Sequence, residues 1–371
     1  MCSTHHPAPA SSDADADAAP EPSGLDDRIV TSAIGTLELF GVYLGIRLGL
    51  YQNLAADGPA TSPELARRAG IDERYAREWL EQQAVAGYLT VEDASASAQE
   101  RRFDLPEGHH GFLADPTDGG HVAPLAQMVV GVANTLDEVV EAYRTGAGVP
   151  YEHYGADFRN GQGGINRPAF ENDLVDAWLP AVVGVADTLD GGGSIADVGC
   201  GQGYSTVAIA GRWPQADVIG VDVDAASVAD ARAVAQAAGS TARFAGIDGS
   251  GLPELGPFNV ITMLECLHDM AHPVEALVAA RKALADDGVL VIADELVADE
   301  FHAPGDELER MMYGWSISHC LPACRTEPKS AELGTVVRAS TIESLCREAG
   351  FATVEVVDVD GGFFRIYAVR P

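Results

Sequence analysis

The sequence predicts an α/β fold, in which a mostly parallel sheet is covered by helices on both faces and ends in an antiparallel strand. Beyond residue 190, short apolar runs alternate with helical stretches, a pattern typical of parallel strands buried on both faces. The last two apolar runs are instead joined by Asp360-Gly-Gly362, which indicates a hairpin. A smaller, mainly helical domain is expected before this sheet.

The composition restricts the partners of the chain. It has 371 residues, with 56 Asp and Glu against 23 Lys and Arg, and a formal net charge of −33. A chain this acidic repels phosphate backbones and anionic lipid, so neither nucleic acid nor a membrane is expected as a partner. A GC-rich genome explains the excess of Arg and Ala, and adaptation to high salt would also explain the acidity. The sequence does not separate the two.

The first 24 residues are rich in Ala, Pro, Ser and Asp, and residues 1–24 are predicted to form a disordered tail. They lack the basic start and apolar core of a secretory signal, so the six cysteines are expected to be reduced thiols in a cytoplasmic protein. No metal is expected, because Cys320 and Cys324 are separated by a proline and no CxxC occurs. Phe40 to Leu50 is apolar but too short to cross a membrane, and it is predicted to be a buried helix.

Residues 25–110 are predicted to form a winged-helix domain. An apolar helical pattern runs from about Leu25 to Gln52. A capped helix follows from Thr61 to Gly70, and another covers Asp72 to Ala86. Two short strands, 88–91 and 103–105, complete the pattern of two helices and a ribbon. Acidic residues interleave with the Arg residues of both helices, which favours dimerisation and closure of a pocket over DNA binding.

Residues 111–185 are predicted to be a helical linker, and residues 186–371 the sheet domain. In the linker, helical segments at Val122–Ala142 and Phe170–Ala186 flank a polar stretch, Tyr151 to Asn166. The expected strands of the sheet domain are 195–198, 217–221, 242–244, 258–262 and 289–293, followed by the hairpin strands 353–359 and 363–369.

A glycine-rich turn, Asp197-Val-Gly-Cys-Gly-Gln-Gly203, follows the first strand of that domain. The third glycine of a dinucleotide fingerprint would fall on Tyr204 and no phosphate-binding G-K-S/T occurs, so both of those interpretations fail. Asp197 is placed where an acid can meet the ammonium of a ligand. Asp222 ends the next strand, where an acid can bind both hydroxyls of a ribose, and Asp248 follows the third strand and suits an adenine amine. An amine, a ribose and an adenine with no phosphate site describe S-adenosylmethionine.

On these residues the chain resembles class I S-adenosylmethionine-dependent methyltransferases of the two-domain kind, which carry an N-terminal winged-helix dimerisation domain. The resemblance covers roughly residues 25–371. Cys266-Leu-His-Asp-Met270, His319-Cys-Leu-Pro-Ala323 and Leu333-Gly-Thr335 are similar to a bacterial branch that is like the small-molecule O-methyltransferases. The resemblance implies a Rossmann-like sheet, a homodimer and a cofactor site. The residues expected to bind the cofactor are Asp197, Gly199, Gly201, Gly203, Asp222, Asp248, Gly249 and Leu264.

The resemblance also implies a catalytic base. In the similar small-molecule O-methyltransferases, the His of a comparable segment deprotonates the acceptor hydroxyl, which implies that role for His268 with Asp294 as its carboxylate partner. An imidazole with a pKa near neutral suits such a proton transfer. Met270 departs from the Trp of that family, so a capping or pocket-lining role for His268 stays open. His319 is the alternative base.

An insertion after the fifth strand is expected to roof an acceptor pocket or to pack as plain core; its apolar and aromatic residues are Met311, Met312, Tyr313 and Trp315. Tyr151 and Tyr154 are placed near the methionine end of the cofactor. The predicted function is methyl transfer from S-adenosylmethionine to a small, largely apolar acceptor, with oxygen as the expected atom. Two alternatives remain: a winged-helix transcriptional regulator, and an enzyme of the same fold that uses the cofactor for non-methylating chemistry.

Overall fold

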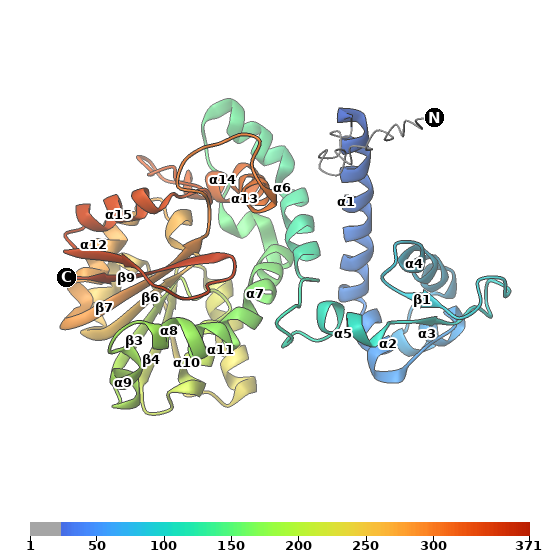
Figure 1. Cartoon of the computed structure of the whole chain (residues 1–371), viewed down its shortest axis with the longest axis horizontal. Coiled ribbons are helices and arrows are strands. Elements are labelled where there is room, and N and C mark those ends of the chain that lie inside the picture. Colours follow the sequence, from blue (N-terminus) through green and yellow to red (C-terminus); the bar gives the residue numbers. More distant parts are fainter. Residues whose placement is uncertain (1–23) are drawn as a thin grey trace, which may run out of the picture.

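The computed structural model describes residues 24–371, so the predicted tail lies outside the described residues apart from Gly24. The first part of the described chain is a helical unit with a two-stranded ribbon (Figure 1). Its elements are α1 (Leu25–Arg47), α2 (Leu50–Asp57), α3 (Ser62–Ala69), α4 (Glu73–Val85), β1 (Thr90–Val91), β2 (Phe103–Asp104) and α5 (Glu107–Leu113). The carboxylate of Asp72 caps α4, and β1 pairs with β2 antiparallel. This is the predicted arrangement of two helices and a ribbon.

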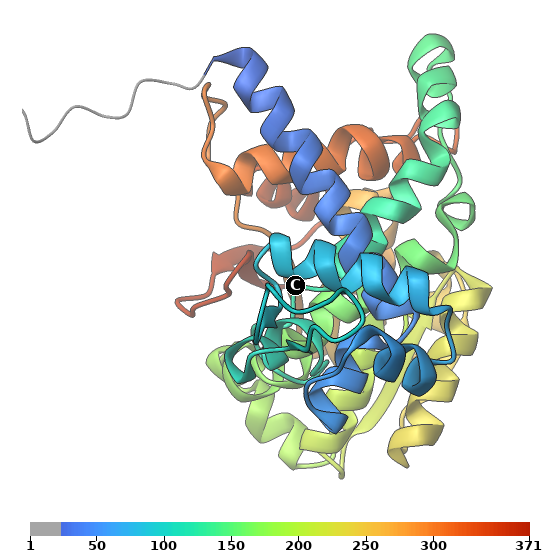
Figure 2. The same cartoon turned by 90° about the vertical axis from the view of Figure 1, so that its right-hand side faces the viewer.

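Helix α1 is mostly exposed, and the segment predicted to be buried, Phe40 to Leu50, is buried only in part. Of its 23 residues only Gly41, Val42 and Gly45 are buried. Its exposed large apolar side chains are Leu25, Ile29, Val30, Ile34, Leu37, Phe40 and Leu44. The helix also ends earlier than predicted, because Gly49 adopts a left-handed backbone with φ of 64°. By length and mean hydropathy (1.6) alone, α1 qualifies as a membrane span. In Figure 1 it stands upright between the sheet domain and α4, and in Figure 2 it runs obliquely across the view.

The connecting segment is helical almost throughout. It contains α6 (Leu125–Thr145), η1 (Tyr151–Tyr154), α7 (Gly155–Glu171), η2 (Leu174–Trp178), α8 (Leu179–Ala181) and α9 (Val185–Asp190). The polar stretch that was expected between two helices is itself η1 and most of α7. Glycines let α7 approach α6 closely: a Cβ on Gly161 would lie 2.6 Å from the backbone nitrogen of Met128, and one on Gly131 would lie 2.5 Å from the Cβ of Phe158. Close packing of the two helices therefore explains Gly161 of α7 and Gly131 of α6.

The second half of the chain forms a seven-stranded sheet, as predicted. The strands are β3 (Ser194–Val198), β4 (Asp217–Asp222), β5 (Arg243–Gly246), β6 (Phe258–Leu264), β7 (Leu284–Glu295), β8 (Thr353–Val356) and β9 (Phe364–Arg370). Their order is β5-β4-β3-β6-β7-β9-β8. All neighbouring pairs are parallel except those of β9, which runs antiparallel to β7 and to β8. The strand order reverses between β3 and β6, and open α/β sheets bind ligands at such a point.

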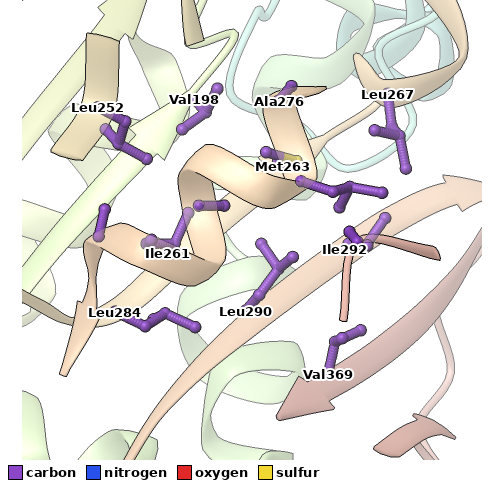
Figure 3. Close-up of a cluster of buried hydrophobic side chains, with 14 of the residues drawn as sticks. Val198, Leu252, Ile261, Met263, Leu267, Ala276, Leu284, Leu290, Ile292 and Val369 are labelled. Atoms are coloured by element: carbon purple, nitrogen blue, oxygen red, sulfur yellow. The ribbon is translucent and has the colours of Figure 1, made fainter. Parts of the chain in front are cut away.

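Helices cover both faces of this sheet. The remaining elements are α10 (Tyr204–Arg212), α11 (Ala225–Ala238), η3 (Gly249–Glu254), η4 (Leu267–Asp269), α12 (Pro273–Ala283), α13 (Glu307–Trp315), η5 (Ser316–Cys320), α14 (Leu321–Cys324) and α15 (Ala339–Glu348). On one face, Ala276 of α12 lies in one apolar cluster with Ile261, Met263 and Leu290 of the sheet (Figure 3). Ile342 of α15 belongs to the same cluster. On the other face, η2, α8, α9 and α10 form a second apolar cluster.

Candidate active site

The glycine-rich turn after β3 is built for close approach of the backbone. Gly199, Gly201 and Gly203 all lie in the left-handed region, with φ of 70°, 51° and 78°. A Cβ on Gly199 would lie 2.8 Å from the sulfur of Cys266, whereas nothing lies within 4 Å of the position of a Cβ on Gly201. The turn is therefore packed against the protein at Gly199 and open at Gly201, where a ligand can lie against the backbone.

Asp197 anchors this turn. Its carboxylate is buried and accepts three hydrogen bonds, from the hydroxyls of Ser205 (2.6 Å), Thr206 (2.6 Å) and Thr262 (2.8 Å). Burial raises the pKa of Asp197, while these hydrogen bonds oppose the rise. The three hydroxyls join β3 to α10 and β6, so the observed contacts of Asp197 are with the protein's own side chains.

Two further carboxylates stand at the ends of neighbouring strands. At the end of β4, Asp222 Oδ2 accepts from Gly201 N and Oδ1 accepts from Asp224 N, both at 2.8 Å. After β5, the exposed Asp248 accepts from Ser250 N at 2.7 Å and begins η3. Gly249 is next to Asp248, and its backbone faces Val198 of β3. Leu264, at the end of β6, is 6% exposed. The structure thus places all the predicted cofactor residues along the carboxyl edge of β3 to β6.

Helix α7 is attached to this edge through polar side chains. Asn160 Oδ1 accepts from Gln202 Nε2 of the glycine turn at 2.8 Å. Arg159 forms an ion pair with Asp230 of α11 at 3.0 Å, and Asn166 donates to Glu265, the residue after β6. Side chains of α7 therefore reach the turn after β3, helix α11 and the end of β6, all of which surround the predicted cofactor site.

Tyr151, in η1, is also near this edge, and its hydroxyl donates to Gln162 of α7 at 3.0 Å. Burial raises the pKa of the Tyr151 phenol, with smaller effects from Asp222 and Asp269. Tyr154, at the other end of η1, points to a different element: its hydroxyl donates to the backbone oxygen of Ser318 in η5 at 3.1 Å.

His268 lies in a buried cluster of acids. Its Nδ1 is 3.0 Å from Asp294 Oδ1 and 3.4 Å from Glu295 Oε2, and its Nε2 is 3.4 Å from Asp269 Oδ1. His268, Asp294 and Glu295 are at most 3% exposed. Among the described residues, Asp269 Oδ1, Asp294 Oδ2 and Glu295 Oε2 are buried without a hydrogen-bond partner. The predicted pair of His268 and Asp294 is thus within hydrogen-bonding distance, but it has more acidic neighbours than expected.

The acids determine the charge of the imidazole. Burial alone would lower the pKa of His268, because it disfavours the charged form. The carboxylates of Glu295, Asp294 and Asp269 outweigh burial and raise this pKa well above the usual range of imidazole. Burial likewise raises the pKa of Glu295 well above its usual range, whereas His268 holds the pKa of Asp294 below it. At neutral pH His268 is therefore an imidazolium, and its positive charge offsets the negative charge of the surrounding carboxylates.

His319 lies in an aromatic setting instead. Its ring stacks on Phe158 at a centroid distance of 4.0 Å, and the edges of Tyr154 and Tyr151 contact it at 4.4 and 5.8 Å. Burial lowers the pKa of His319 to about 4, so the ring is neutral. Its Nε2 is buried without a partner, and Nδ1 is 3.3 Å from the sulfur of Cys320. Of the roof residues that were predicted, Met312 is buried, and Trp315 packs beside the cluster of Tyr154 and Phe158.

Sequence reasoning missed Glu265 and Asn166. Glu265 has a signal in the sequence, since it directly follows an apolar strand and precedes His268 by three residues. Asn166 has none, because its contact with Glu265 spans 99 residues of chain.

Comparison with known proteins identifies the class. Residues 171–356, half of the chain, match a family described as a methyltransferase domain, and residues 35–115 match an Rv2258c-like winged helix-turn-helix domain. The chain therefore belongs to the methyltransferase-domain family. It is an S-adenosylmethionine-dependent methyltransferase with an N-terminal winged-helix domain, as the resemblance implied.

Two proteins of known activity match this chain over a short segment only. Trans-aconitate 2-methyltransferase from Afipia carboxidovorans is 55% identical over 38 residues, and that from Azoarcus sp. is 48% identical over 44 residues. These matches cover 10% and 12% of this chain, and 15% and 17% of the length of those proteins.

Solved structures match over nearly the whole chain. Human N-acetylserotonin methyltransferase, solved with S-adenosylmethionine, has a TM-score of 0.70 at 16% identity and covers 94% of this chain and 98% of its own. Mitomycin 7-O-methyltransferase has a TM-score of 0.65 at 17% identity and covers 93% of this chain and 97% of its own. A putative O-methyltransferase from Nostoc punctiforme has a TM-score of 0.69 at 16% identity and covers 95% of this chain and all of its own. At these identities the likeness shows the fold.

Proposed function

We propose that this methyltransferase methylates an oxygen of a small, largely apolar acceptor. His268 would accept the proton of the acceptor hydroxyl, and Asp294 would orient His268. The observation that carries the proposal is the contact of 3.0 Å between His268 Nδ1 and Asp294 Oδ1, at the same sheet edge as the glycine turn. The carboxylate of Asp294 orients the ring, and once the imidazolium has released its own proton, Nε2 can accept the proton of the acceptor hydroxyl.

The cofactor would be held by the backbone of the glycine turn and by the carboxylates of Asp222 and Asp248. Each oxygen of Asp222 accepts one backbone hydrogen bond and keeps lone pairs for a ribose hydroxyl. Gly249 and Leu264 would line the adenine and methionine parts. Bound there, S-adenosylmethionine supplies an electrophilic methyl group, and the enzyme's main contribution is to hold the acceptor oxygen in line with it.

The acceptor would lie beneath the insertion that contains α13, η5 and α14. Its apolar and aromatic side chains, together with Tyr154 and Phe158, favour a flat acceptor with few polar groups. His268 is only 2% exposed in this conformation, so binding of an acceptor at its Nε2 requires the insertion to shift. The neutral His319 is the second candidate for the base.

The assembly proposed for this enzyme is a homodimer formed through α1. The exposed apolar side chains of α1 would be buried against a second copy, which also accounts for a hydropathy high enough for a membrane span. A cytoplasmic location and the domain limits 25–110, 111–185 and 186–371 remain part of the proposal. A DNA-binding role has little support, because Arg74 and Arg77 of α4 form ion pairs with Glu78 and Glu73.

The first experiment is calorimetric titration with S-adenosylmethionine and S-adenosylhomocysteine, at low and high salt. Micromolar binding of both is expected, followed by a screen of phenols, hydroxy acids and amines for formation of S-adenosylhomocysteine. His268→Asn should lower turnover roughly 10²–10⁴-fold and leave the affinity for S-adenosylhomocysteine nearly unchanged. Unchanged turnover would remove His268 from the proton step. Consumption of the cofactor without a methylated product would favour non-methylating chemistry.

A further inference from the structure

Glu265 occupies a constrained position at the centre of the site. It directly follows β6, beside the point where the strand order reverses, and its φ of 52° lies in the left-handed region, which is uncommon for a residue with a side chain. The backbone nitrogen of Glu265 donates to Ala293 O of β7 at 2.8 Å. Its carboxylate accepts a hydrogen bond from Asn166 of α7. Such backbone strain persists only where surrounding structure enforces it, and it is concentrated at functional sites.

The charged groups around Glu265 come from two elements. His268 and Asp269 belong to η4, and Asp294 and Glu295 belong to β7. Burial raises the pKa of Glu265 to about 7; His268 and the hydrogen bond from Asn166 partly offset the rise. Near neutral pH the protonated and ionised forms of the Glu265 carboxyl group are therefore both populated, whereas His268 is protonated.

Exposure divides the cluster of acids around His268 into two groups. His268, Asp294 and Glu295 are enclosed, with at most 3% of their surface exposed. Glu265 and Asp269 are only partly buried, but Asp269 Oδ1 is buried 3.4 Å from His268 Nε2, whereas the carboxylate of Glu265 accepts a hydrogen bond from Asn166 of α7. Near neutral pH the cluster thus has a charged, enclosed imidazole and, at Glu265, a carboxyl group on a residue that is not fully enclosed.

We propose that Glu265 faces the reacting methyl group and accepts the proton of the acceptor hydroxyl when His268 is charged. This inference rests on the proposed function and adds a second proton acceptor to it. As the acceptor oxygen bonds to the methyl carbon, the carbon–sulfur bond breaks and its electron pair stays on sulfur. The hydroxyl proton moves to the Glu265 carboxylate, which later releases it to water. Asn166 is a positioning residue whose hydrogen bond favours the ionised form of this carboxyl group.

The test compares two ligands that differ by one positive charge at the reacting sulfur. S-adenosylmethionine carries a sulfonium there, and S-adenosylhomocysteine a neutral thioether. A positive charge within about 4–6 Å lowers the pKa of a carboxyl group by about 1–3 units. At pH 7, a carboxyl group whose pKa falls from about 7 to about 6 releases roughly 0.4 proton. Calorimetry in phosphate and in Tris, which differ in ionisation enthalpy, measures this release without any acceptor.

The expected result is that wild-type enzyme releases roughly 0.4 proton more with S-adenosylmethionine than with S-adenosylhomocysteine at pH 7. Glu265→Gln should abolish this difference, and the matched control Glu275→Gln on the exposed face of α12 should keep it. Asn166→Ala removes the donor that favours the ionised form, so it should move the difference to higher pH.

Equal proton release with both ligands in the wild type, or a difference that survives Glu265→Gln, would overturn the assignment of Glu265 while leaving the cofactor site intact. Failure of either ligand to bind would instead overturn the proposed function together with this inference. With any hydroxyl acceptor that is turned over by the complex with S-adenosylmethionine, kcat/KM for the acceptor should rise with pH at about 6 in the wild type, and this rise should be missing in Glu265→Gln.

Discussion

Asp222 offers the sharpest test of the cofactor site, through the substitution Asp222→Asn. Each of its carboxylate oxygens accepts a backbone hydrogen bond of 2.8 Å, one from Gly201 and one from Asp224. An amide cannot satisfy both donors, because its nitrogen would face one of the two backbone N–H groups. It also removes the negative charge and one of the two acceptors offered to the ribose hydroxyls.

The expected loss follows from these contacts. A hydrogen bond to a charged group contributes about 1.5–3 kcal/mol, and about 1.4 kcal/mol corresponds to a tenfold change in affinity. Losing one such bond to the ribose should raise the Kd for S-adenosylmethionine and for S-adenosylhomocysteine roughly 10- to 150-fold. Both ligands should weaken equally, because they share the ribose and differ only at sulfur.

Calorimetric titration of Asp222→Asn with both ligands measures these values. Asp217→Asn is the matched control: it makes the same substitution at the opposite end of β4, where Asp217 is exposed and pairs with Arg243. The control should bind both ligands like the wild type. A change of less than about threefold in Asp222→Asn, with the fold intact by circular dichroism, would refute the assignment of Asp222 to the ribose.

Three further predictions concern stability and assembly. Asp197→Ala should lower the free energy of unfolding by roughly 3–6 kcal/mol, because three buried hydroxyls lose their acceptor; urea unfolding that matches wild type would contradict this. His268→Asn should destabilise the protein at about pH 6 and progressively less as pH rises. The pKa of His268 is raised in the folded state, so the stability that its protonation adds is fully present below the unfolded-state pKa of about 6.5 and is lost as pH rises through the folded-state pKa. A loss of unfolding free energy in urea that is the same at every pH would contradict this prediction. Leu37→Asp, at an exposed position of α1, should convert a dimer to a monomer in analytical ultracentrifugation, and an unchanged mass would argue against α1 as the interface.

The sheet, and the edge of it where the cofactor is proposed to bind, could be predicted from the sequence for a physical reason. Parallel strands that are buried on both faces are apolar throughout, and each is followed by a turn at the same edge. The apolar runs alone therefore predict that the residues after β3, β4 and β5 share one edge of the sheet, and the fold has them there.

Helix α7 shows where such reasoning fails. Its sequence is polar, carries four glycines and includes Pro168, all of which argue against a helix on propensity alone. Packing against α6 overrides that propensity, and the glycines permit the close approach. For α1 the helical period predicts the helix correctly, but an apolar pattern does not reveal whether the covering surface belongs to the same chain.

By itself, the sequence determined the class of fold, the glycine turn and the acids at successive strand ends, because these depend on local pattern and on the fixed direction of parallel strands. Only the tertiary structure decided which groups share a charged environment. It brought Asn166 to Glu265 across 99 residues and enclosed His268 among three carboxylates. Protonation depends on burial and on nearby charge, and both arise only when distant segments pack together.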